Sequence, residues 1–96
     1  MVGVSKIQME IIESDSLKDK RKVLKSLKDR VKKRFNASIF ETSFLDNRRK
    51  AELEIAVVAD NRTGAEKVLQ EILKFIEVDG RTEIVLKSDH FFYCNY

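Results

Sequence analysis

Ten lysines and arginines lie within residues 18–34, against two acids, Asp19 and Asp29. Ammonium and guanidinium groups at this density bind phosphate through charge and hydrogen bonds, the chemistry expected of nucleic-acid binders. The chain has 19 basic and 16 acidic residues in all, so its excess positive charge is concentrated in this segment. The basic residues are Lys18, Lys20, Arg21, Lys22, Lys25, Lys28, Arg30, Lys32, Lys33 and Arg34.

Leucine and valine recur at helical spacing through this segment, which predicts a helix over residues 17–35 with Ser16 as its N-cap. Most of the cations then lie on the half that faces solvent. Like charges stand four residues apart, as in Lys18/Lys22 and Lys28/Lys32, and each such pair costs about 0.2–0.5 kcal/mol. A plain solvated face usually alternates its charges, so this pattern favours an anionic partner, although a solvated face remains the alternative.

Cations in the first turn oppose the helix dipole, but together with the free N–H groups they offer a site for phosphate. No base-reading motif is visible, so we expect contacts mainly to phosphate, with RNA or a ribosomal particle as the partner. The predicted contacts are Lys18, Arg21, Lys22, Lys25, Lys28 and Lys32, extended by Arg48, Arg49 and Lys50 in a later turn.

A second polar group could form where the first helix begins. The helical angle of Lys20 places it on the buried side, and strand alternation points Glu41 inward as well. The two could form a structural ion pair. Alternatively, they could line a small polar pocket with Asp46, joined by Arg48, that serves a small-ligand sensor or an enzyme.

Other chemistry has little support. His90 and Cys94 are too few to hold a metal without Asp89 as a third ligand, and we expect no metal, cofactor or catalytic residue. A lone cysteine cannot form an internal disulfide, and no apolar stretch is long enough to span a bilayer. With no apolar signal segment after Met1, the sequence indicates a cytoplasmic protein.

The elements that must position these residues follow the order β-α-β-β-α-β. Strands are expected at residues 2–12, 37–45 and 51–59 and from Thr82 onward, and a second helix at residues 62–78 with Gly80 as its cap. Right-handed crossovers then give one domain over residues 1–96, a ferredoxin-like α+β sandwich with a four-stranded antiparallel sheet and both helices on one face. The tail from Asp89 to Tyr96 has no clear assignment.

The open face of that sheet is predicted to show polar side chains and no aromatic residue on its two central strands. Acids there repel phosphate, which argues against the stacking of bases on the sheet. Phe40 and Phe44 on the edge strand are instead candidate contacts of a homodimer, which makes a protein-interaction module the alternative function. The polar set is Lys6, Gln8, Glu10, Glu52 and Glu54.

The segment Ser16-Leu17-Lys18-Asp19-Lys20-Arg21 resembles the Ser-Leu-Lys-Glu-Lys-Arg of the YlxP-like family of small bacterial proteins. Residues 35–38, Glu41, Asp46 and residues 56–58 add to the resemblance, which extends from Val2 to about Leu86. It implies a ferredoxin-like fold, and the neighbourhood of family genes to translation genes suggests a role linked to ribosomes. Arg48 stands where the family often has Trp, and Glu54 where it often has Gly.

Overall fold

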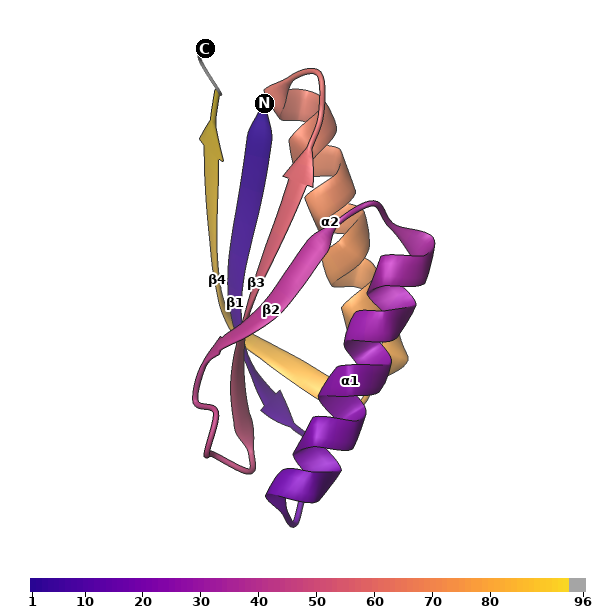
Figure 1. The fold of residues 1–96 in the computed structure, drawn as a ribbon, viewed down its shortest axis with the longest axis vertical. Helices are drawn as coiled ribbons and strands as arrows, with labels where there is room; N and C mark the ends of the chain where they lie inside the picture. The colour runs from indigo at the N-terminus through magenta and orange to yellow at the C-terminus, as the bar shows by residue number, and fades with distance from the viewer. Residues whose placement is uncertain (94–96) are drawn as a thin grey trace.

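The computed structural model describes residues 1–93, and its helices and strands follow the predicted order (Figure 1). Four strands form one antiparallel sheet in the order β2-β3-β1-β4, and α1 and α2 lie on the same side of it. The chain therefore has the ferredoxin-like fold. The strands are β1 (Val2–Ile11), β2 (Ser38–Ser43), β3 (Lys50–Val58) and β4 (Thr82–Phe92); the helices are α1 (Leu17–Arg34) and α2 (Arg62–Asp79).

The register of β1 between its two neighbours decides which side chains face the helices. Ile7 pairs with Leu53 of β3 and is buried, whereas Lys6 pairs with Glu54 and is exposed on the open face. Because alternate residues of a strand point to opposite faces, one set enters the core and the other meets solvent. The predicted alternation of β1 and β3 is confirmed.

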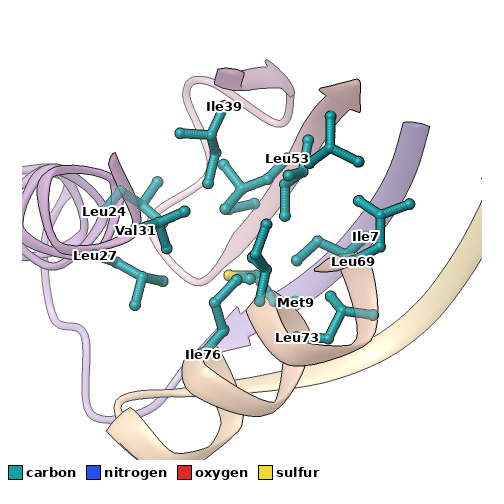
Figure 2. Close-up of a cluster of buried hydrophobic side chains, with 14 of the residues drawn as sticks. Ile7, Met9, Leu24, Leu27, Val31, Ile39, Leu53, Leu69, Leu73 and Ile76 are labelled. Atoms are coloured by element: carbon teal, nitrogen blue, oxygen red, sulfur yellow. The ribbon is translucent and has the colours of Figure 1, made fainter. Parts of the chain in front are cut away.

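The core lies between the sheet and both helices (Figure 2). Each leucine or isoleucine buried there contributes about 1.5–3 kcal/mol relative to an exposed one. Gly3 allows a close approach of β1 to α2, because a Cβ there would lie 3.1 Å from Ala65 Cβ and 3.2 Å from Leu69 Cδ1. The labelled core residues are Ile7, Met9, Leu24, Leu27, Val31, Ile39, Leu53, Leu69, Leu73 and Ile76.

Local signals in the sequence fix the ends of both helices. Ser16 accepts a hydrogen bond from the amide of Asp19 at the start of α1, and Asn61 accepts one from Gly64 at the start of α2. Gly80 ends α2 in the left-handed conformation, with φ at 79°, as predicted. Neither helix is long and apolar enough to cross a membrane.

Two strands differ from their predicted bounds. β2 ends at Ser43, earlier than expected, because its register with β3 shifts after Glu41 and Phe44 adopts a left-handed φ of 60°. β4 continues to Phe92, so much of the tail that lacked an assignment pairs with β1. Cys94, the other half of the candidate metal pair, lies outside the described residues.

Candidate nucleic-acid interface

The helix α1 presents most of its cations to solvent while its apolar stripe enters the core. Leu24, Leu27 and Val31 are buried, and the cations between them point away from the sheet. We call six of these cations the basic face. Its members are Lys18, Arg21, Lys22, Lys25, Lys28 and Lys32, of which Lys28 is half-buried and the others are exposed.

The basic face is not neutralised by neighbouring carboxylates. Among residues 1–93 no member of this set lies within ion-pair distance of an acid. Arg30, on the same helix, contrasts with this set because it pairs with Asp79 of α2. The basic face is thus a row of free positive charges on a rigid helix.

The first turn of α1 is less open to phosphate than the sequence suggested. Ser16 Oγ accepts a hydrogen bond from the Asp19 amide at 3.1 Å, and Asp19 Oδ2 lies 3.4 Å from the amide of Asp15. One N–H group is therefore already used, and a carboxylate stands beside it. Phosphate contacts are better placed along the side of the helix than at its end.

Lys20 is the exception among the basic residues, since it is fully buried. Its Nζ lies 2.9 Å from Glu41 Oε2 and donates a hydrogen bond of 2.6 Å to the carbonyl oxygen of Phe44. Glu41 Oε2 has no hydrogen bond of good geometry among the described residues, so the pair is held by charge. The structure brings Lys20 and Glu41 together, as their positions in the sequence suggested.

The turn after β2 is organised around the same carbonyl group. Phe44 O also accepts a hydrogen bond from the Asn47 amide at 2.9 Å, and Asn47 Oδ1 accepts from the amides of Arg49 and Lys50, both at 2.9 Å. The hydrogen bonds of the Phe44 carbonyl group, those of the Asn47 side chain and the buried Lys20 therefore determine the course of this turn.

The residues of this turn fall into two environments. Arg48 and Arg49 line a hollow with Leu17 at the start of α1 and with Asp15. Asp46 is exposed in the same hollow, whose lining includes neither Lys20 nor Glu41. Arg49 and Lys50 also border a second hollow, whose lining includes Glu10, Glu13 and Asp15.

The polar part of the open sheet face is a connected network. Glu52 accepts hydrogen bonds from Gln8 at 3.0 Å and from Thr42 at 3.1 Å. Lys6 Nζ lies 3.5 Å from Glu54 Oε1. The hydrogen bond from Gln8, with help from Thr42 and the charge of Lys6, lowers the pKa of Glu52, although desolvation opposes it. The Glu52 carboxylate is therefore ionised at neutral pH, which disfavours a nucleic acid on this face.

Beyond this network the open face carries apolar side chains beside polar ones such as Ser88 and His90, which the sequence indicated only in part. Val2 pairs with Val58 on one side and with Phe92 on the other, and Val4 pairs with Ala56. Phe40 belongs to this face and is 70% exposed, whereas Phe44 lies beyond the end of β2. The expectation that both phenylalanines lie on the edge strand is therefore wrong for Phe44. Phe92 was missed because the extension of β4 into the tail was not predicted.

The candidate metal ligands of β4 do not converge. His90 pairs with Val4 on the open face, and its Nε2 lies 3.3 Å from Ser88 Oγ. Asp89 points to the helix side, where Ser5 Oγ donates a hydrogen bond to it at 2.7 Å. Within residues 1–93 no three His, Cys, Asp or Glu side chains are grouped to hold a metal.

Comparison with known proteins places the chain in a family. A family model described as "Protein of unknown function (DUF503)" matches residues 2–88. The uncharacterized protein YlxP of Bacillus subtilis (strain 168) is 39% identical over 77 residues, which cover 80% of this chain and 84% of YlxP. The chain belongs to the DUF503 family.

Solved structures support the fold of this DUF503 chain. The de novo designed protein Foldit4 matches with a TM-score of 0.60 at 17% identity, covering 97% of this chain and all of Foldit4. A designed protein with a ferredoxin fold matches with a TM-score of 0.56 at 22% identity, covering 97% and 89% of the two chains. These similarities concern the arrangement of the backbone alone.

The motif by which the chain resembles YlxP-like proteins has a structural explanation in this DUF503 member. Ser16 caps α1, Asp19 supports the cap, and Lys20 anchors the turn after β2. Lys18 and Arg21 have no such structural role and remain exposed on the basic face.

Proposed function

We propose that this DUF503 domain binds RNA, or the surface of a ribonucleoprotein particle, through the basic face of α1 with Arg48 and Arg49. The observation that carries the proposal is the exposed row of cations on α1, none of which pairs with an acid among the described residues. Arg49 and Lys50 contribute less than Arg48, because Glu10, Glu13 and Asp15 line the same hollow.

A polyanion relieves an unfavourable arrangement in the free protein. Like charges at i and i+4 along α1 repel one another, and Asp29 offsets only part of that repulsion. Phosphates placed beside the helix would offset this repulsion by attracting the cations, and counterions would be released from the RNA. The ribosome is the first target to examine, because the resemblance to YlxP-like proteins suggests a role linked to ribosomes.

The dependence of affinity on salt tests this proposal. If about five phosphates are neutralised, the log–log slope of affinity against salt concentration is roughly −3.5 to −4.5. Fluorescence anisotropy with labelled RNA between about 50 and 200 mM salt measures this slope. A slope near zero would contradict the proposal.

The apolar half of the open sheet face favours a second candidate function, a protein-interaction module that pairs with a second copy. Val58 is 80% exposed and Phe40 is 70% exposed there, and no element of residues 1–93 covers them. This face carries charges of both signs, whereas the basic face would repel its own copy.

A ligand site at Lys20, Glu41 and Asp46 has weaker support. The Lys20 ammonium group already contacts Glu41 and Phe44, and Asp46 lies apart in the exposed hollow.

A further inference from the structure

The C-terminal end of α1 meets α2 in a cluster of two aromatic rings and two guanidinium groups. Phe35 and Phe75 are in edge-to-face contact, with ring centroids 5.7 Å apart. The Arg34 guanidinium carbon lies 5.9 Å from the Phe35 centroid and 5.6 Å from the Phe75 centroid. Arg30 lies over Phe75 as well, at 5.3 Å. The cluster thus holds the last residue of α1 over two rings.

The two arginines, Arg30 and Arg34, differ in whether a carboxylate partner uses their hydrogen-bond donors. Arg30 pairs with Asp79, whose side chain is nearly buried. Arg34 is exposed and has no carboxylate partner among residues 1–93. Its guanidinium group therefore lies against aromatic rings and retains hydrogen-bond donors for a ligand.

A groove opens beside this cluster, and its lining suits a nucleobase. Its walls are Arg34, Phe35, Glu71, Lys74, Phe75 and Val78. Val78 is 78% exposed, so the groove offers apolar surface as well as charge. Flat guanidinium groups and aromatic rings are the surfaces on which unpaired bases stack in RNA-binding proteins.

The position of the groove connects it to the basic face. Lys32 and Arg34 point to different sides of the last turn of α1, and the exposed Lys33 lies between them around the helix, so a strand that leaves the basic face would cross Lys33 to reach the groove. A duplex could contact the cations, but its paired and stacked bases could not enter the groove.

We infer that the groove at Arg34 and Phe75 binds one unpaired base, so that the preferred ligand is single-stranded RNA or a loop rather than a continuous duplex. This inference rests on the proposed function. The alternative is that Arg34 only joins the two helices.

The test compares a single-stranded RNA of about twelve nucleotides with the duplex of the same sequence, each at about 50 and about 200 mM salt. The variant Arg34→Lys keeps the charge but removes the flat plane, and Arg62→Lys is the matched control, since Arg62 is an exposed arginine over the ring of Phe91 at the start of α2. We expect Arg34→Lys to weaken single-strand binding about tenfold while leaving duplex binding unchanged, because stacking of one base is lost. Arg62→Lys changes neither, since Arg62 lies outside both the basic face and the groove.

Three results would overturn the inference. Equal effects of Arg34→Lys and Arg62→Lys, or a duplex bound as tightly as the single strand, would reduce the groove to a contact between helices while leaving the proposed function intact. If neither RNA binds in a salt-dependent manner, the proposed function fails together with the inference. Circular dichroism of each variant establishes that it is folded.

Discussion

Lys20 Nζ lies 2.6 Å from the carbonyl oxygen of Phe44, and this contact joins the first turn of α1 to the turn after β2. The turn carries Arg48 and Arg49, and the helix carries the basic face. Lys20 is therefore a positioning residue, which aligns two basic segments without binding the partner itself. Phe44 can offer its carbonyl here because it adopts a left-handed conformation.

Replacement of this lysine is the first prediction. Lys20→Met leaves Glu41 without its counter-charge and Phe44 O without one donor, so we expect the free energy of unfolding to fall by about 3 kcal/mol. Urea denaturation followed by circular dichroism measures the loss. The double variant Lys20→Met/Glu41→Gln should regain part of it, because no unpaired carboxylate remains. A loss below about 0.5 kcal/mol in the single variant, the range of an ordinary surface change, would contradict this assignment.

Asp79 gives a prediction about pH. Its carboxylate accepts hydrogen bonds from Arg81, which hold the pKa of Asp79 below its ordinary value, with further support from the charge of Arg30. A depressed folded pKa stabilises the fold above the unfolded pKa of about 4, and this contribution is lost as the pH falls through the folded pKa. The network joins the end of α2 to α1 and to the start of β4.

We therefore expect Asp79→Asn to cost about 2 kcal/mol at pH 7 and to weaken the dependence of stability on pH below about 4. Urea denaturation at pH 7 and at pH 3 checks both statements. Some acid sensitivity should remain, because Glu52 also has a lowered pKa and is unchanged in the variant. If the free energy of unfolding fell equally in the variant and the wild type between pH 7 and pH 3, Asp79 would not be a source of the acid sensitivity.

The open sheet face gives a prediction about association. If two copies pair through it, Val58→Asp should weaken the dimer about tenfold, because a charge enters an apolar contact. Phe44→Glu should have a smaller effect, since Phe44 lies beyond the end of β2. Sedimentation velocity at tens of micromolar protein and two salt concentrations measures the distribution. A monomer under all these conditions would remove this candidate.

Much of the fold was predictable, because periodicity and caps agree along the chain. Ser16, Asn61 and Gly80 act through hydrogen bonds and backbone angles to near neighbours, which a sequence displays directly. Lys20 was predicted to be buried from its helical angle alone. To predict that Lys20 pairs with Glu41, only the topology of the fold was needed in addition.

Other features depend on contacts between distant segments. Gly3 is required by the approach of Ala65 and Leu69 from α2, and nothing near Gly3 in the sequence indicates this. The groove joins Arg34 to Phe75 on another helix, so the basic residues were visible but their aromatic partner was not. The length of β4 was underestimated. Phe92, at its end, faces the open side of the sheet, so this part of the strand lacks the pattern of a buried strand.

The most direct test of the central claim is equilibrium binding of ribosomal subunits and total RNA to two charge variants. Lys22→Glu/Lys25→Glu reverses the middle of the basic face, and Lys67→Glu/Lys87→Glu makes the same change in net charge away from it. We predict that the first variant loses salt-sensitive binding while the second retains most of it. Equal losses in both variants, or no binding by the wild type, would contradict the assignment of the basic face as an RNA-binding surface.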